Sequence, residues 1–173
     1  KVVRMDSIGL FNTAGTAGLQ QRYCCDCEGC PLRAAGNDGE RHCPVTGLYI
    51  NLIGGTQVEP VWLGGQIVGT VYEDDHARYC QLNEIHPDPK RSREQQVTQV
   101  FERMEAALQS VGMDFTNVVR KWLFVDDILD WYGELNRTRD RFFTSRGIYD
   151  VLVPASTGIG GSNVFGSAIV GSL

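Results

Sequence analysis

The chain has 173 residues, of which 42% are hydrophobic and 21% charged, and its formal net charge at pH 7 is −5. This length suits one domain with an extension, and it is enough to bury a core without disulfides. The negative charge argues against nucleic acid as a partner, because phosphate binding needs a clustered positive face. No apolar run approaches the roughly 20 residues that span a bilayer. Since no secretory pattern is present either, we expect a cytoplasmic protein with no membrane partner.

Residues 1–46 form a predicted extension that differs in composition from the rest of the chain. They carry five of the six cysteines and many glycines, with no sustained hydrophobic period. That composition is typical of loops held together by something other than an apolar core. Residues 47–173 have regular hydrophobic patterns, and we expect them to form the folded domain.

The cysteines of the extension are a candidate metal site. Cys24, Cys27 and Cys30 recur every three residues, and Cys43 supplies a fourth thiol. Four thiolates can hold zinc or an iron–sulfur cluster, and this spacing is nearer to the cluster pattern. A set of free thiols is the third interpretation. Elemental analysis with an anaerobic absorption spectrum would distinguish the three, whereas Cys80 is expected to be a small core residue in a strand.

The folded part begins with β-prone runs. Residues 48–53 and 58–63 are predicted strands, the second on a sheet edge because it contains Pro60. Residues 65–72 and 77–85 are the next predicted strands, separated by a polar turn.

A helix is then predicted from Ser92 onward. Ser92 and Gln95 have capping-box spacing, and Gly112 is a natural terminator. One apolar stripe at helical spacing is expected to face a sheet, and it comprises Val97, Phe101, Met104, Leu108 and Val111.

A strand and a second helix follow the first helix. Residues 117–125 have the β-branched and aromatic composition of an interior strand, and Asp126 or Asp127 can cap the next helix. The predicted inner face of that helix comprises Leu129, Tyr132, Leu135, Arg139 and Phe142. A loop through Pro154 then leads to a glycine-rich turn, and residues 163–170 are the last predicted strand. The order predicts an α+β fold with both helices packed on one face of the sheet.

Four features of this region resemble the Rid family, whose members are often labelled endoribonuclease or translation inhibitor. Residues 104–113 resemble the end of the family's first helix, and residues 117–127 are similar to its D-V-V-K-x-T-V-F-x-x-D strand. Asn136 precedes the Phe142–Phe143 pair with the family's spacing, and residues 154–155 occupy the place of its Pro-Ala-Arg motif.

The resemblance implies a mixed sheet of the Rid-like kind, also known as chorismate mutase-like of the bacillus type. It implies a homotrimer that binds a small carboxylated or carbonyl metabolite at subunit interfaces and requires no cofactor. The family's endoribonuclease label gains no support from this acidic chain, which lacks a basic stripe.

Several positions depart from the family's pattern. Ser156 stands where active imine deaminases have the arginine that grips the substrate carboxylate, and a hydroxyl cannot replace a bidentate guanidinium. Residues 164–170 lack the acidic residue of the family's last strand, and residues 82–85 replace its Ser-Gly-Gln-Ile. We therefore expect a metabolite-binding protein or a hydrolase or deaminase-like enzyme, rather than an ordinary 2-aminoacrylate deaminase.

The candidate site residues follow from this comparison. The predicted catalytic residues are Glu84, Ser156 and Thr157. The predicted ligand-binding residues are Arg120, Asn136, Arg139, Gly158 and Gly160. Ordinary structural roles remain open for each group: a tight turn for the glycines, and solvated or ion-paired surface positions for the arginines.

Two alternative functions remain open. Residues 130–139 and 154–161 also look similar to the N-terminal half of chorismatase-type hydrolases, which contain two Rid-like halves. On that interpretation the chain is a half-domain without the catalytic groups of the second half. The other alternative is a non-catalytic binding or assembly module clipped by a metal in the extension.

Overall fold

The structure is a computed structural model that describes residues 5–7, 34–35, 41–42, 50–53, 55–163 and 165–173. It contains two short antiparallel pairs that involve residues of the extension. One pair joins β1 (Met5–Ser7) to β4 (Ile50–Leu52), and the other joins β2 (Ala34–Ala35) to β3 (Arg41–His42). The candidate metal ligands Cys24, Cys27, Cys30 and Cys43 lie outside the described residues, so their role stays a prediction.

The folded domain contains two three-stranded sheets. The first is an antiparallel sheet of β5 (Val58–Leu63), β6 (Gln66–Glu73) and β7 (Arg78–Leu82). In the second, β8 (Arg120–Val125) pairs antiparallel with β10 (Ile169–Ser172) and parallel with β9 (Ala155–Gly160).

Backbone hydrogen bonds between β10 and the end of β7 join the two sheets into one. Leu82 N donates to Leu173 O at 2.8 Å, and Leu173 N donates back to Leu82 O at 2.9 Å. Ile85 and Gly171 exchange a second pair of bonds, both of 2.9 Å. The result is the predicted mixed sheet, in the order β5-β6-β7-β10-β8-β9.

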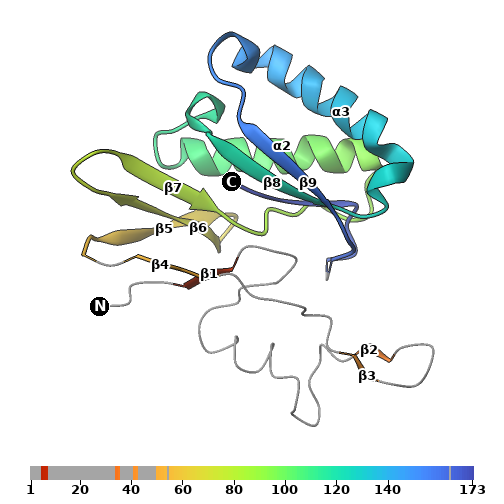
Figure 1. The fold of residues 1–173 in the computed structure, drawn as a ribbon, viewed down its shortest axis with the longest axis horizontal. Helices are drawn as coiled ribbons and strands as arrows, with labels where there is room; N and C mark the ends of the chain where they lie inside the picture. The colour runs from red at the N-terminus through yellow and green to blue at the C-terminus, as the bar shows by residue number, and fades with distance from the viewer. Residues whose placement is uncertain (1–4, 8–33, 36–40, 43–49, 54, 164) are drawn as a thin grey trace.

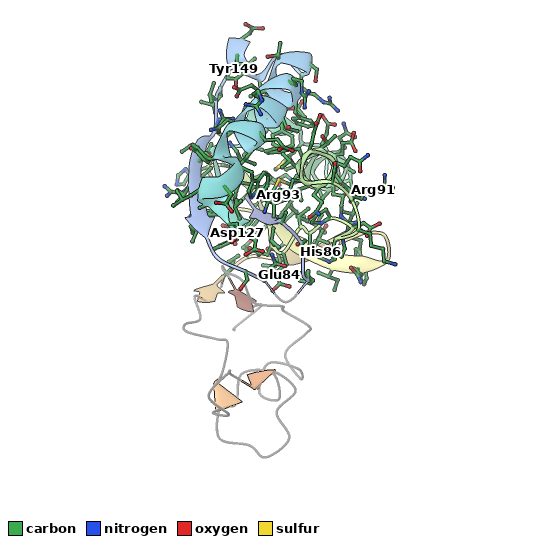
Figure 2. The ribbon with its side chains drawn as sticks, turned by 90° about the vertical axis from the view of Figure 1, so that its right-hand side faces the viewer. Glu84, His86, Arg91, Arg93, Asp127 and Tyr149 are labelled. Atoms are coloured by element: carbon green, nitrogen blue, oxygen red, sulfur yellow. The ribbon has the colours of Figure 1, made fainter. Side chains whose placement is uncertain are left out.

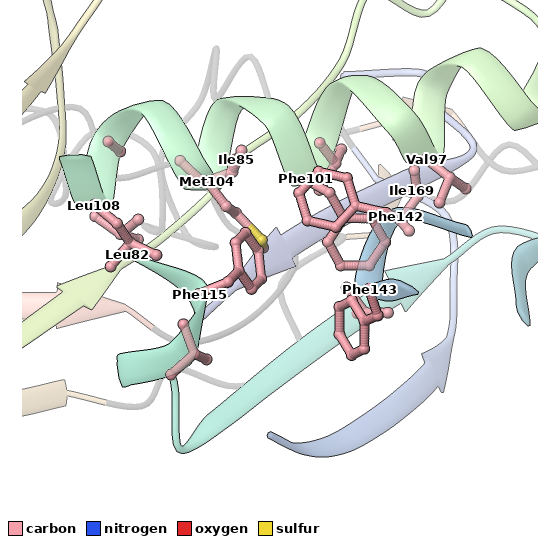
Figure 3. Packing of buried hydrophobic residues seen from close by; sticks show 14 of the residues in the cluster. Leu82, Ile85, Val97, Phe101, Met104, Leu108, Phe115, Phe142, Phe143 and Ile169 are labelled. Carbon is pink, nitrogen blue, oxygen red and sulfur yellow. The ribbon is translucent and has the colours of Figure 1, made fainter. Parts of the chain in front are cut away.

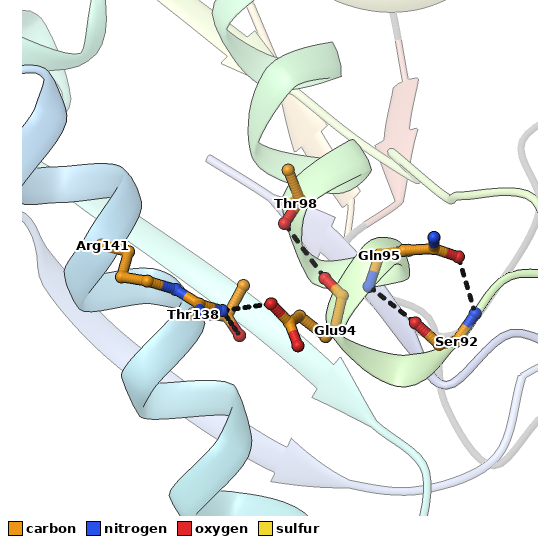
Figure 4. A network of polar contacts seen from close by, with 6 residues as sticks. All are labelled: Ser92, Glu94, Gln95, Thr98, Thr138 and Arg141. Atoms are coloured by element: carbon orange, nitrogen blue, oxygen red, sulfur yellow. Dashed lines mark hydrogen bonds and ion pairs between the residues drawn. The ribbon is translucent and has the colours of Figure 1, made fainter.

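Two helices cover one face of this sheet, α2 (Arg93–Gln109) and α3 (Ile128–Ser145) (Figure 1). The predicted capping box at the start of α2 is confirmed. Gln95 N donates to Ser92 Oγ at 3.3 Å, and Ser92 N donates to Gln95 Oε1 at 3.2 Å (Figure 4). An ion pair between Glu94 and Arg141 ties the first turn of α2 to α3. No helix in the described part of the chain is long and apolar enough to span a membrane.

The core lies between the helices and the sheet. The predicted stripe on α2 is buried at Val97, Phe101, Met104 and Leu108, and Val111 packs against the rim of the core. Phe101 sits in an aromatic cluster with Phe142 and Phe143, with ring centroids 5.2 and 5.8 Å away (Figure 3). These contacts hold α2 and α3 together above the sheet.

The predicted inner face of α3 is wrong at its N-terminal end. Leu129 and Tyr132 are 91% and 51% exposed, whereas Trp131 is 4% exposed and takes the core position. The cause is a kink, because Trp131 has non-helical angles of φ −140° and ψ 19°. Its indole N–H donates to Asp126 O at 2.7 Å, which holds the ring inward. Asp127 precedes the helix in a left-handed conformation (φ 47°) and makes no side-chain cap.

The predicted glycine-rich turn is also wrong, because residues 155–160 form β9, a strand parallel to β8. The glycines serve packing here. A Cβ at Gly158 or Gly160 would lie only 3.2 or 3.1 Å from the side chain of Ile128 at the start of α3. Small residues let β9 approach the helix closely.

The last strand begins later than the predicted residue 163, at Ile169. Asn163 accounts for this difference, because its Oδ1 accepts bonds from Phe165 N at 3.1 Å and Ser167 N at 3.3 Å. Such a side-chain turn replaces the strand ladder locally.

A matched pair of leucines on α3 tests the corrected face. Leu135 is 3% exposed and Leu129 is 91% exposed. We expect Leu135→Ala to lower the free energy of unfolding by about 2–5 kcal/mol, because it leaves a cavity in the core. Leu129→Ala should change it by no more than about 0.5 kcal/mol. Urea denaturation monitored by circular dichroism measures both, and equal losses would contradict the kinked arrangement.

Candidate functional site

A large cleft opens where β7 and β8 separate. β10 lies between them only as far as Leu82 on β7 and Trp122 on β8. Beyond these residues the cleft has a volume of about 1030 Å³. Its walls come from β6, β7, β8, the end of α2 and the loop that follows α2. A volume of this size suits a small-molecule ligand.

The lining of this cleft is basic and aromatic. Arg78 and Arg120 supply its charge, and none of its described lining residues is acidic. Asn83, Asn117 and Gln81 add amide groups. The cleft therefore favours an anionic or strongly polar group over a cation.

Arg120 is held at the mouth of the cleft by its neighbours in the sheet. Its guanidinium lies 4.9 Å from the ring centroid of Trp122, and Nη2 donates to Thr157 Oγ1 at 3.3 Å. In the described part of the chain no carboxylate forms an ion pair with it. As far as the described residues are concerned, its remaining N–H groups are available to a ligand.

The opposite wall of the cleft is formed by β7. Arg78 Nη1 donates to Val111 O at 2.7 Å, which ties β7 to the end of α2. The rings of Tyr72 and Tyr79 stack with centroids 5.0 Å apart and form an aromatic surface beside it.

Ionisable groups in the cleft favour binding over proton transfer. Burial raises the pKa of the Cys80 thiol to about 11, so this residue is neutral at pH 7. Desolvation, and then the nearby charge of Asp74, raises the pKa of Tyr79 above its ordinary value. Neither group is poised for general acid–base work near neutral pH.

A second polar group lies on the other face of β8, beneath α3. Lys121 is only 1% exposed, and its Nζ lies 4.6 Å from the centroid of the Phe143 ring. Burial, and then the charge of Arg139, lower the pKa of Lys121 to about 8. Its register partner on β9 is Ser156, an exposed residue.

Arg139 is part of an ion pair on α3. Its Nη2 lies 2.8 Å from Asp140 Oδ1, and Tyr149 OH donates to the same oxygen at 2.6 Å. The bond from Tyr149, followed by that from Arg139, holds the pKa of Asp140 below its usual value. Arg139 is therefore ion-paired on α3, which is one of the structural roles that the sequence left open for it.

Glu84 and His86 lie elsewhere. Figure 2 shows both near the sheet, at the end of the domain opposite Tyr149. Glu84 has a left-handed backbone (φ 54°) and is not among the residues that line the cleft. His86 stacks on Phe165 with centroids 4.0 Å apart, and burial lowers its pKa.

Comparison with known proteins agrees with this fold. Residues 80–162 match the sequence model of the family described as endoribonuclease L-PSP. Among solved structures, the YjgF gene product of E. coli is similar with 19% identity and a TM-score of 0.52, over 65% of this chain and 88% of that one. The fold of this chain is therefore Rid-like.

Other structures of the Rid type are similar to a comparable degree. Yeast Mmf1 has 15% identity and a TM-score of 0.54, over 67% of this chain and 95% of its own. E. coli TdcF with bound serine has 13% identity and a TM-score of 0.53, over 65% of this chain and 88% of its own. Among curated protein sequences, none matches the chain.

Within this Rid-like fold, the predicted site residues fall into separate groups. Arg120 and Thr157 meet beside the cleft. Ser156 lies on the helix-facing side of β9 with Gly158 and Gly160, and Arg139 and Asn136 come from α3 above. Glu84 joins neither group, and the catalytic roles of Glu84, Ser156 and Thr157 remain predictions.

Two basic residues escaped the sequence analysis, Arg78 and Lys121. The sequence could have indicated that Lys121 is buried. Arg120 and Lys121 are consecutive in a strand, so their side chains must point to opposite faces. Leu123 and Val125 show that the face of Lys121 is the core face. No comparable signal marked Arg78.

The buried lysine makes stability depend on pH. Lys121 loses its proton near pH 8 when folded and near 10.5 when unfolded, so the unfolded state binds more protons between these values. Stability attributable to this residue should therefore rise by about 1–3 kcal/mol as pH increases through this window. Urea unfolding at pH 7.5 and 9.5 should show this rise in the wild type relative to Lys121→Met, which retains Cys80 and the tyrosines. Parallel changes in the two proteins would contradict it.

Proposed function

We propose that this protein binds a small metabolite with a carboxylate or carbonyl group in the cleft beside Arg120. The observation that carries the proposal is the charge of the lining, which includes Arg78 and Arg120 and no acidic residue among those described. An arginine fork matches a carboxylate in charge and geometry.

The surroundings of Arg120 support this role. Stacking on Trp122 and the bond to Thr157 fix the plane of the guanidinium while leaving donors available. The aromatic rings of Trp122 and Tyr79 can cover the apolar part of a ligand. TdcF, a similar fold, is described with bound serine, a small carboxylate. The Rid-type fold thus agrees with the ligand class that the charges favour.

Binding is favoured over catalysis in this cleft. Hydrolysis or deaminase-like chemistry needs a group that moves a proton near neutral pH. Glu84, the first candidate for that role, does not line the cleft, and Cys80 is held in its thiol form. With Ser156 in place of the family's arginine, ordinary 2-aminoacrylate deamination is not proposed.

Self-association forms part of the same proposal. The face of the sheet opposite the helices carries large apolar side chains, among them Trp62 (55% exposed) and Ile67 (48% exposed). These two are register partners, and Val61, the neighbour of Trp62, points into the core. Exposed apolar residues of this size commonly mark an interface. We propose that they contribute to a homotrimer.

Calorimetric titration with L-serine and pyruvate tests the ligand site. We expect Arg120→Ala to weaken binding of any carboxylate that the wild type takes by at least about tenfold, a loss of about 1.4 kcal/mol. Arg120→Lys should retain part of the affinity, because it keeps the charge but loses the fork. Serinamide, which lacks the carboxylate, should discriminate little between wild type and Arg120→Ala.

The matched control is Arg141→Ala, which removes an exposed arginine that pairs with Glu94 away from the cleft. It should bind like the wild type. Equal affinities for wild type and Arg120→Ala would exclude Arg120 as the carboxylate ligand, and no binding of either probe by the wild type would count against this ligand class.

Sedimentation equilibrium tests the assembly. A homotrimer should have a mass near three times the 19.2 kDa of the chain. Trp62→Glu should lower that mass, since it places a charge in the proposed interface, whereas Leu129→Glu on the exposed part of α3 should not. A wild-type mass equal to one chain would contradict the trimer.

A further inference from the structure

A second, smaller groove lies where the loop before α2 and the loop before β10 meet the side of α2. It has a volume of about 340 Å³, near the lower end of the range for small-molecule sites. Its lining comprises His86, Asp88, Gln99, Arg103, Phe165 and two prolines of the loop before α2. We call it the α2 groove. None of these residues lines the cleft beside Arg120, so the two sites are separate.

Arg103 supplies the positive charge of the α2 groove. Its side chain is partly buried, and its Nε has no hydrogen-bond partner in the described part of the chain. Among the same residues no carboxylate forms an ion pair with it, although four other arginines have such a partner. A partly buried charge without a counter-ion is unfavourable. An anion that enters the groove would compensate it.

Gln99 places a second donor beside Arg103. It precedes Arg103 by four residues on α2, so the two side chains lie on the same face of the helix. Its Oε1 accepts a hydrogen bond from Asp88 N at 2.8 Å, which fixes the amide and leaves the NH2 group to donate elsewhere. The guanidinium and the amide can therefore bind the two oxygens of one carboxylate.

The rest of the α2 groove is lined largely by rings. The imidazole of His86 stacks on Phe165 with centroids 4.0 Å apart, and its Nδ1 lies 3.4 Å from Pro87 O. Burial lowers the pKa of His86 more than the bond to Pro87 raises it, and the charge of Arg103 also lowers it. The ring is therefore largely uncharged at pH 7. Together with the prolines, these rings offer an apolar surface to the body of a ligand.

The charges of the α2 groove favour a ligand with one negative charge. Arg103 is the one permanent cation among the lining residues, and Asp88 adds a carboxylate whose Oδ1 accepts from Lys90 N at 3.0 Å. A phosphate group, which has nearly two negative charges at pH 7, would exceed the charge of one guanidinium and be repelled by Asp88. We propose that the α2 groove binds a small monocarboxylate, with its carboxylate on Arg103 and Gln99 and its apolar body against His86 and Phe165.

Nuclear magnetic resonance titration of the wild-type protein with benzoate tests the proposal, observed through the imidazole signals. The sequence contains three histidines, and the variant His86→Gln assigns the signal of His86. We expect benzoate to shift this signal in a saturable manner, because its ring would lie against the imidazole. Benzamide has the same shape without the charge, and it should bind at least about tenfold more weakly. Inorganic phosphate should bind at least about tenfold more weakly as well.

The variant Arg103→Gln removes the charge and keeps a polar side chain, and it should weaken benzoate binding by at least about tenfold. The matched control is Arg141→Gln, which removes an exposed arginine that pairs with Glu94 outside the groove. It should bind like the wild type. Arg120→Ala in the cleft should also leave the titration of His86 unchanged, so failure at the α2 groove and failure at the cleft are distinguishable.

Three outcomes would overturn the proposal. The first is a His86 signal that does not move with benzoate in the wild type. The second is equal affinity in the wild type and in Arg103→Gln. The third is binding of benzamide or phosphate as tight as that of benzoate, and this comparison needs no variant that could fail to fold.

Discussion

The domain depends on the close packing of α2 against β10 at Gly171. A Cβ at this position would overlap the methyl group of Met104 and lie 3.0 Å from Val100 Cγ1. The backbone of Gly171 also exchanges hydrogen bonds with Ile85 at 2.9 Å. One residue without a side chain thus allows the helix to cover the seam at which the two three-stranded sheets become one. A larger residue would push the helix from the strand that joins them.

Gln96 reinforces the same seam with polar contacts. It is 4% exposed, and its Nε2 donates to Arg91 O at 2.8 Å while its Oε1 accepts from Ala168 N at 2.7 Å. These bonds connect the loop before α2 to the residue that precedes β10. They give hydrogen-bond partners to the carbonyl of Arg91 and the amide of Ala168, and they satisfy the amide group of the buried Gln96. The position of β10, and with it the position of the cleft between β7 and β8, follows from both sets of contacts.

The parts of this arrangement that the sequence predicted are those governed by local rules. The Ser92–Gln95 capping box and the stripe from Val97 to Leu108 depend on residues within one helix, and both are confirmed. The kink at Trp131 escaped prediction because it depends on a hydrogen bond to Asp126 O outside the regular helix. β9 escaped because glycines usually indicate turns, and here they make room for Ile128. Both features, the kink and β9, depend on contacts between segments that local sequence rules do not describe.

Tertiary contacts also determine the candidate site, and the sequence alone did not predict them. Arg120 was a candidate from the sequence, but its value as a ligand group comes from Trp122 and Thr157, which the sheet places beside it. Lys121 is its immediate neighbour and has the same formal charge, but the alternation of the strand sends it into the core. There burial, and then the charge of Arg139, favour the uncharged amine, whereas the guanidinium of Arg120 stacks on Trp122 at the cleft. Two adjacent basic residues thus acquire opposite environments, one at a cleft that suits an anion and the other in an apolar core that disfavours its charge.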